Sequence, residues 1–520
     1  MTEHGDAAAG ERTTDVEPLG TAGADDAAQP ATDAQPMTAV GADAVAEPEP
    51  PQHDVVVIGA GVAGLVVAND LARRGYDVVV LEARERTGGI VSSHELAGLA
   101  LDAGAESFAV RGGAVAELAE QLGLGDDLVD PEPGGAWLRL QGRSVPLPRN
   151  SMLGIPSVPL AQDVIAVLGW RGALRAYLDR LMPVLKVGKD DRLGPLVERR
   201  MGKAVLQRLV APISGGVYSS DARDLDVAVV APGLNEAMTR AGSLSGGVAL
   251  RIGDGARPGS AVRGIRGGMH RLTDALRGEV DRRATIHAGV VVDRVERDGA
   301  GWAVQAGERR WTTSAVVVAT PGVAAAALLE GVGIDLEAAP ATTVELVTLV
   351  VDGLDGAPRG SGALVAEDAG IAAKALTHAT AKWAWLAEAA GGRAVLRLSY
   401  GRAGEAPATA GLDDAGAIAL ARRDAADILG VPVPEPVAAD RVRWEQAQPS
   451  SAIGARAMQR RVREAVAAEP NLEVVGAWLA GTGLAQVVPQ AREAALRIRR
   501  ERFGEQVDET LDGDGADVGG

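Results

Sequence analysis

The sequence predicts an α/β fold built around one nucleotide-binding βαβ unit, and three observations lead to this prediction. A continuous apolar run from Val55 to Ile58 is typical of a strand buried on both faces. A helix is expected over residues 65–74, because apolar side chains recur there at helical spacing and a Gly follows at 75. A second apolar run at residues 77–81 then predicts a parallel strand beside the first.

Composition narrows the remaining classes. A chain of 520 residues with 47% hydrophobic content suggests two to four domains, at about 100–200 residues each. The chain has no Cys, which excludes disulfides, thiolate metal sites and Cys nucleophiles, and no pair among its six His has metal spacing, so no metal site is expected. We find no signal peptide and no apolar run of about 18 residues. A cytoplasmic protein without a transmembrane span is therefore expected, and peripheral membrane contact is left open.

The acidity of the chain belongs to its ends. Residues 1–53 carry eleven acids against one Arg, and residues 505–520 carry six acids and no base. Both segments lack the aromatic and branched side chains of a core, so they are expected to be disordered acidic tails. Residues 54–504 hold only about −2 of the net charge of −18. Such a neutral body argues against nucleic acid as a partner, because phosphate binding needs a basic face.

Further elements follow along the chain. A helix is expected at 112–123, a proline-rich loop at 145–159, and a mostly helical segment at 160–210. Residues 241–260, rich in Gly and Ser, are expected to form a mobile loop. The remaining strands are expected at 285–320, 343–352, 394–400 and 472–476, and the remaining helices at 413–429, 451–468 and 489–503.

The turn after the first strand has the G-x-G-x-x-G pattern. Gly59 permits the tight turn, Gly61 lets the backbone approach a pyrophosphate, and Gly64 lets helix and strand pack closely. The pyrophosphate would lie at the helix N-terminus, where free N–H groups and the helix dipole favour negative charge. Glu82 ends the second strand, where an acid binds ribose hydroxyls. The residues expected at the pyrophosphate are Gly59, Ala60, Gly61, Val62, Ala63 and Gly64.

The segment after this acid extends the adenosine site. It resembles the run that follows the ribose acid in FAD enzymes of the amine oxidase and protoporphyrinogen oxidase type, which implies FAD as the cofactor. Arg86 would reach a phosphate, and the Gly pair at 88–89 would let the chain cross the cofactor closely. The residues expected along this part of FAD are Glu82, Ala83, Arg86, Gly88, Gly89 and Ile90.

A third run, Leu101 to Phe108, resembles the acid-x-Gly-Pro-[Asp or Glu]-Ser-Phe segment that passes the flavin ring in Gram-positive coproporphyrinogen III oxidases. Ala105 replaces the Pro of that segment. The resemblance implies that the isoalloxazine is lined by Gly104, Ala105, Glu106 and Ser107.

Taken together, residues 54–503 resemble the oxygen-dependent coproporphyrinogen III oxidases, which are related to protoporphyrinogen oxidase. Further runs with the family's order and spacing are 148–156, 212–219, 266–272, 382–383, 400–405 and 443–449. The resemblance implies a Rossmann-type FAD-binding domain with an interleaved mixed-sheet substrate domain and a helical subdomain. The segments expected are 54–110, 262–322 and 441–504 for the FAD-binding domain, 111–150 and 323–440 for the substrate domain, and 151–240 for the helical subdomain.

The resemblance also implies more distant contacts. Val292, in an expected strand at 290–293, would meet the adenine, and Trp444 would lie near the cofactor. Arg111 and Arg149 would pair with substrate propionates through charge-assisted bonds, with a solvated surface Arg as the alternative for each. The pyrimidine end of the flavin would meet Gly483, Leu484 and Ala485. The chain departs from the family directly after them, at 486–491.

The implied reaction places the chemistry on the cofactor, so no catalytic side chain is expected. A bridging carbon of the porphyrinogen would give a hydride to flavin N5 while a pyrrole N–H loses a proton. Molecular oxygen would reoxidise the flavin and form hydrogen peroxide, over three rounds, and contact with the next haem-pathway enzyme is left open. Three alternatives remain: a protoporphyrinogen oxidase, another amine- or polyene-oxidising flavoenzyme, and a flavin-containing porphyrin-binding protein without turnover.

Overall fold

The computed structural model describes residues 52–503 except 183–191, 254–261, 337–341, 355, 357 and 446–453. The predicted acidic tails therefore lie outside the described residues, apart from Gln52 and His53, and His53 already begins the first strand. The description below concerns the unit that starts at Pro50.

The first sheet is the core of the nucleotide-binding part, and its central strand β1 (His53–Ile58) is parallel to β2 and β15. Val56 pairs with Val79 on one side and with Val316 on the other, so the strand is buried on both faces. The strands in spatial order are β12 (Thr285–His287), β2 (Val78–Leu81), β1, β15 (Arg309–Val318), β14 (Gly301–Ala306) and β13 (Arg294–Asp298), with β21 (Leu472–Val474) parallel to β15. The predicted Rossmann-type α/β fold is confirmed.

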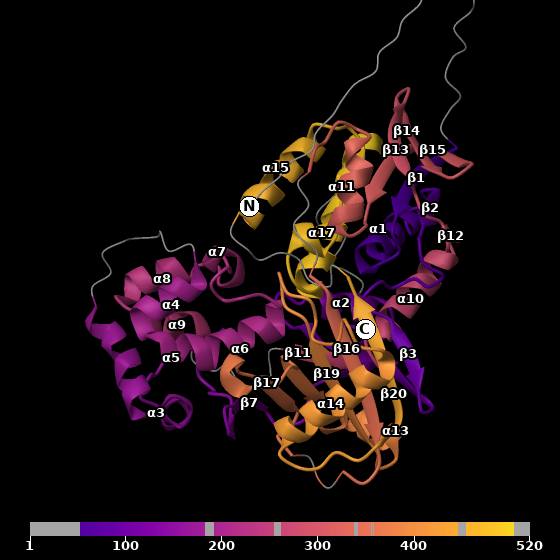
Figure 1. The fold of residues 1–520 in the computed structure, drawn as a ribbon. Helices are drawn as coiled ribbons and strands as arrows, with labels where there is room; N and C mark the ends of the chain where they lie inside the picture. The colour runs from indigo at the N-terminus through magenta and orange to yellow at the C-terminus, as the bar shows by residue number, and fades with distance from the viewer. Residues whose placement is uncertain are drawn as a thin grey trace, which may run out of the picture. The chain divides into compact units, whose positions relative to one another are not determined.

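Helices cover both faces of this sheet (Figure 1). Helix α1 (Val62–Ala72), α10 (His270–Asp281) and α17 (Leu484–Phe503) share one apolar core with Val55 and Val57. The opposite face carries Val56 and Ile58 and packs against the helices α11 (Gly322–Glu330) and α15 (Ala455–Ala467). The turn that follows β1 at the carboxyl end of the sheet therefore lies between helices packed on both faces.

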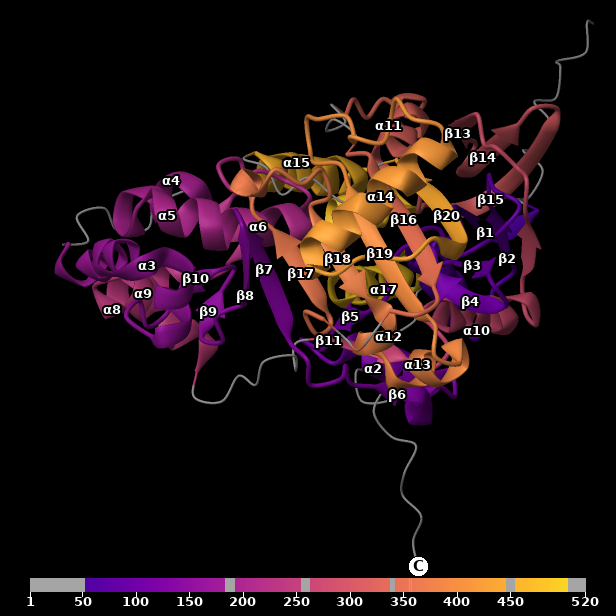
Figure 2. The same ribbon diagram turned by 60° about the horizontal axis from the view of Figure 1, so that its bottom comes forward.

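The second sheet is mixed, as predicted, because β17 and β7 are parallel and its other pairs are antiparallel. Helix α14 (Asp414–Leu429) lies across one face of it (Figure 2), and Ala421, Ala425 and Ile428 of this helix join the core of that sheet. The strands in spatial order are β20 (Pro436–Trp444), β16 (Val344–Val351), β19 (Ala394–Tyr400), β18 (Ala375–His378), β17 (Gly362–Val365), β7 (Ala136–Leu140) and β8 (Arg143–Pro146).

A helical segment with its own core confirms the prediction for 160–210 in its described part. The buried ion pair between Arg200 and Asp179, at 2.6 Å, ties two of its turns together. Two π-helical turns, η3 (Leu206–Val210) and η4 (Ser214–Tyr218), follow one another near its end. The other helices are α3 (Gln162–Tyr177), η2 (Leu178–Leu181), α4 (Leu193–Met201), α5 (Lys203–Val205), α6 (Ala211–Ile213), α7 (Val227–Val230), α8 (Leu234–Ala241) and α9 (Leu244–Ile252).

The loop predicted at 241–260 is wrong over its described part, because α9 occupies Leu244–Ile252. The Ser243 hydroxyl caps this helix by accepting from the Gly246 N–H. A Cβ on Gly247 would lie 2.7 Å from the backbone N of Met238 in α8. The small residues thus serve close helix packing rather than a loop, and residues 254–260 of the prediction lie outside the described residues.

Two further boundaries differ from the predictions. The final helix begins at Leu484 instead of Pro489, because the buried pair Val487 and Val488 extends its apolar face before the proline. The strand predicted at 290–293 is an irregular connection. Its two ends bond different strands: Val290 donates to Glu82 O, and Asp293 donates to Gln305 O.

The smaller elements stay close to the prediction. Helix α2 (Ala114–Gln121) lies within the expected 112–123. The segment 145–159 begins with the end of β8 and then holds the short strands β9 (Ser151–Met152) and β10 (Ile155–Pro156) among turns. Other short pieces are β3 (Ser93–Leu96), β4 (Leu99–Asp102), β5 (Phe108–Ala109), β6 (Leu128–Val129), β11 (Val262–Ile265), α12 (Ala379–Lys382), α13 (Ala384–Ala390), α16 (Ala477–Ala480), η1 (Gly125–Asp127) and η5 (Glu367–Ala369).

Candidate FAD site

The glycine turn between β1 and α1 leaves no room for side chains at two positions. Gly59 has φ +105°, and a Cβ on it would lie 2.7 Å from Ala319 O. A Cβ on Gly64 would lie 1.9 Å from Gly59 O. Gly61 differs, because no atom lies within 4 Å of the position its Cβ would take. The turn is thus tightly packed at Gly59 and Gly64, and it has open space beside Gly61.

The start of α1 offers unsatisfied donors to this open space. The helix has Gly61 as its N-cap, no side-chain cap and no acidic residue in its first turn. The first N–H groups of a helix have no partner within it, and together with the dipole they attract an anion. Ala60, Val62 and Ala63 are buried around this turn. The geometry suits a diphosphate.

Glu82 stands at the end of β2 beside this turn. Its Oε2 accepts from the Ala60 N–H at 2.7 Å, and its Oε1 accepts from the Arg84 N–H at 2.9 Å. A carboxylate has about four acceptor positions, so two remain for ribose hydroxyls. The Val290 N–H donates to Glu82 O, which brings the connection with the partly buried Val292 close to this acid.

The segment after Glu82 crosses the glycine turn. The Gly88 N–H donates to Ala60 O at 2.8 Å, and Gly88 forms a β-bridge with Gly61. A Cβ on Gly89 would lie 3.5 Å from the Gly61 Cα, so a larger residue would narrow the space at the turn. Ala83 and Arg86 are exposed, and Arg86 donates from Nη1 to Ser93 O at 3.3 Å. The structure therefore gathers the Gly pair at the turn, while Arg86 is bonded to the neighbouring strand.

The Gly104–Ser107 turn packs against the same segment. A Cβ on Gly104 would lie 2.0 Å from Ile90 O, which explains the Gly. The Ala105 N–H donates to this same oxygen at 3.1 Å, a bond that a Pro could not form. The departure from the family's Pro thus gains one hydrogen bond. The two sequence motifs are therefore in direct contact through Ile90.

Trp444 joins the two motifs from the second sheet. Its indole Nε1 donates to Ala103 O at 2.8 Å, and the Arg84 guanidinium lies 5.1 Å from the centre of its ring. The side chain is buried. It therefore contacts both the segment after Glu82 and the residue directly before the Gly104–Ser107 turn.

The start of α17 completes the predicted set. Gly483 has φ +95°, with open space where its Cβ would be, and Leu484 packs against the core that includes α1. Ala485 lies in the first turn of the helix. Two buried hydroxyls, of Thr320 after β15 and Thr482 before α17, have no hydrogen-bond partner. Buried polar atoms are normally paired, so these two, together with the open space at Gly61 and the uncapped α1, fit a polar cofactor such as FAD.

The predicted substrate residues lie on separate segments. Arg111 is exposed and near Tyr218 of η4, since burial raises the pKa of that phenol while the charge of Arg111 lowers it. Arg149 is exposed, and its backbone N–H donates to Asp163 at the start of α3. Neither guanidinium has an acidic partner among the described residues, and both stay candidates for carboxylate binding.

Sequence reasoning missed a buried cation. The Lys374 Nζ donates to Ser219 Oγ at 2.5 Å and to Gly401 O at 2.7 Å, and its side chain is 2% exposed. Burial, with help from the nearby Arg402, lowers the pKa of Lys374 to about 7. A single Lys among Ala residues gives no signal of this, because both partners are distant in the sequence. The described residues contain no group of three or more His, Asp or Glu that could hold a metal ion.

A glycine turn that is open at the start of α1, an acid at the end of β2 and a second sheet that contacts the segments beside them fit an FAD-dependent oxidoreductase. The chain belongs to the family of flavin containing amine oxidoreductases, whose model matches residues 62–499. This confirms the predicted cofactor, FAD.

Sequence similarity to several named enzymes covers most of the chain. Coproporphyrinogen III oxidase of Mycobacterium bovis is 31% identical over 450 residues, which cover 84% of this chain and 95% of the relative. The enzyme of that name from Bacillus subtilis is 24% identical over 436 residues, covering 80% and 90%. A solved structure described as a candidate protoporphyrinogen oxidase, from Exiguobacterium sp. 255-15, superposes with a TM-score of 0.77 at 24% identity, covering 87% of this chain and 99% of that one. The predicted family resemblance is confirmed.

Proposed function

We propose that this protein oxidises coproporphyrinogen III to coproporphyrin III with bound FAD, uses molecular oxygen as the acceptor and releases hydrogen peroxide. One observation carries the proposal: the similarity to coproporphyrinogen III oxidase spans 84% of the chain and 95% of the relative. It therefore includes the second sheet and the helical segment, and not only the cofactor half, which many unrelated oxidases share.

Bound FAD supplies the hydride acceptor for this reaction. The residues of the chain then bind and orient it. The Gly59–Gly64 turn and the start of α1 would hold the diphosphate, Glu82 would hold the ribose, and the Gly104–Ser107 turn would line the flavin ring.

The one carboxyl side chain within the Gly104–Ser107 turn, that of Glu106, is unsuited to proton transfer. Burial raises the pKa of Glu106, but Lys382 and Arg397 outweigh it and lower this pKa to about 2. A carboxylate with so low a pKa is a weak base, so Glu106 is poorly suited to take up the pyrrole proton. This agrees with a reaction in which the side chains bind and orient rather than act as acid or base.

Substrate propionates need cationic partners, and we assign this role to Arg111 and Arg149. Both are exposed, and neither has an acidic partner in the described part of the chain. A Tyr lies beside Arg111, which offers an O–H donor to the same carboxylate.

The location of the protein is part of the proposal. No helix in the described ranges is long and apolar enough to cross a membrane. We propose a cytoplasmic enzyme that passes its product to the next enzyme of the haem pathway by direct contact. Co-elution of the two purified proteins in gel filtration would support this contact, and separate elution at concentrations of about 10 μM would argue against it.

The test of the reaction compares two substrates side by side. Purified protein is expected to be yellow, to consume oxygen and to form fluorescent coproporphyrin faster than protoporphyrin. Faster oxidation of protoporphyrinogen would move the substrate assignment. A yellow protein inert toward both porphyrinogens would favour a flavin-containing binding protein or another oxidase, and it would contradict the proposal.

A further inference from the structure

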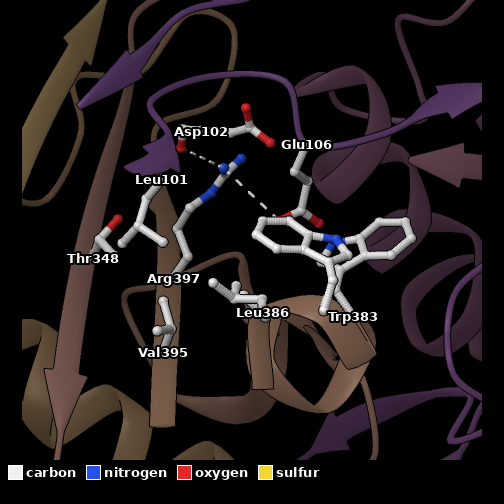
Figure 3. Close-up of a pocket in the computed structure, with 10 residues that line it drawn as sticks. Leu101, Asp102, Glu106, Thr348, Trp383, Leu386, Val395 and Arg397 are labelled. Atoms are coloured by element: carbon white, nitrogen blue, oxygen red, sulfur yellow. Dashed lines mark hydrogen bonds and ion pairs between the residues drawn. The ribbon is translucent and has the colours of Figure 1, made fainter. Parts of the chain in front are cut away.

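An ion network lies behind the Gly104–Ser107 turn (Figure 3). The Lys382 Nζ, at the end of α12, lies 2.6 Å from Glu106 Oε1. The Arg397 Nη1, on β19, lies 3.8 Å from Glu106 Oε2. Each of the three side chains is 15% exposed.

The same region also fixes the backbone of the turn. Arg397 donates from Nη1 to Asp102 O at 3.1 Å and from Nη2 to Gly104 O. Trp444 donates to the carbonyl between them, that of Ala103. Asp102 ends β4, and Ala103 and Gly104 follow it outside any strand, so the buried carbonyls at this end of the strand need side-chain donors. The three consecutive carbonyls of residues 102–104 therefore accept hydrogen bonds from side chains of the second sheet.

The three side chains of the network sum to one positive charge, and the carboxylate of Asp102 lines the same pocket. Glu106 stays ionised because the two cations hold its pKa at about 2 despite its burial. Lys382 and Arg397 together exceed this single carboxylate by one charge. The three side chains are largely buried, so water screens their charges weakly, and Figure 3 shows Asp102 and Thr348 beside them among apolar residues. The pocket beside the network is lined by Leu101, Asp102, Glu106, Thr348, Ala379, Trp383, Trp385, Leu386, Val395 and Arg397.

We propose that Lys382 and Arg397 are positioning residues that tune the flavin: they fix the turn under the ring and make the flavin easier to reduce. The proposal rests on FAD lying against this turn, as proposed above. A nearby cation favours the reduced flavin because the ring gains negative charge on reduction. Glu106 neutralises part of the charge of Lys382 and Arg397. It forms an ion pair with each of them, and it belongs to the turn that they hold.

The test is the midpoint potential of the flavin in the purified holoenzyme, measured against a redox dye. Lys382→Met removes one positive charge, so the potential should fall, with about a tenfold smaller equilibrium constant for reduction. Lys382→Arg keeps the charge and should retain most of the wild-type potential. An unchanged potential in Lys382→Met would overturn the proposal.

Glu106→Gln separates charge from structural damage. It removes a negative charge at nearly constant shape, so the potential should rise, opposite to the shift in Lys382→Met. A merely structural network would move both variants in the same direction, with equal losses of bound FAD and thermal stability. The measurement uses no porphyrinogen, so a failure of the substrate assignment would leave this result interpretable. A colourless wild-type protein would instead defeat the FAD site itself.

Discussion

The two sheets of this protein position their functional groups by different means. In the nucleotide-binding sheet, the turn at 59–64 and Glu82 are at most 23 residues apart, and they act through backbone geometry and one acid. Around the second sheet, the decisive contacts join residues far apart in the sequence, since Lys382 and Glu106 differ by 276 positions and Lys374 and Ser219 by 155. Local steric constraints position the groups of the first region. In the second region, the fold brings together buried charged residues from distant segments.

Gly64→Ala is expected to have the largest effect, because it breaks the steric rule of the first region. The new Cβ would lie 1.9 Å from Gly59 O, and this backbone atom cannot move aside without opening the turn. We expect loss of bound FAD and a clearly lower melting temperature, measured by absorbance and calorimetry.

Gly278→Ala provides the matched control for this variant. Gly278 also lies in a helix, but nothing lies within 4 Å of its Cβ position. We expect normal FAD content and a free energy of unfolding that is higher by about 0.5–1 kcal/mol. Equal damage from both substitutions would mean that close packing at Gly64 is not the cause.

Glu82→Gln tests the acid of the first region. The substitution places an amide where two backbone N–H groups now donate to a carboxylate, and it weakens the bonds to ribose. Hydrogen bonds to a charged group contribute about 1.5–3 kcal/mol, so FAD should bind about 10–100-fold more weakly in a fluorescence titration. The exposed neighbour Glu85→Gln should bind as the wild type does, and an unchanged affinity in Glu82→Gln would remove this residue from the site.

Lys374→Met tests the second region through pH. Burial lowers the pKa of Lys374 from 10.5 to about 7, so the unfolded chain binds more protons between these values. Stability from this residue therefore rises with pH across that window, by at most about 1.4 kcal/mol per pH unit. Urea unfolding from pH 7 to 9.5 should show a shallower dependence in Lys374→Met. The exposed Lys203→Met should keep the wild-type slope, and identical slopes in all three proteins would contradict the role of burial.

How much the sequence could predict follows the same division. The Gly59–Gly64 turn and Glu82 were predictable because each acts within one βαβ unit whose spacing is visible. The Lys374 and Lys382 contacts were not, since a single Lys carries no information about a partner on a distant segment.

Two predictions about helices were wrong for related reasons. The helix at 244–252 was missed because its Gly and Ser resemble a loop, although Gly247 is there to let Met238 approach. The start of α17 was missed because Pro489 is an ordinary signal for the beginning of a helix, while Val487 and Val488 are buried before it.

The central claim is that the diphosphate of FAD lies over the open face of Gly61, and Gly61→Ala tests it most directly. The added methyl meets no protein atom within 4 Å, so the fold without FAD should keep its melting temperature. FAD titrated into this variant should bind at least about tenfold more weakly, because the methyl occupies the space of the phosphates. Wild-type affinity in a normally folded variant would contradict the account.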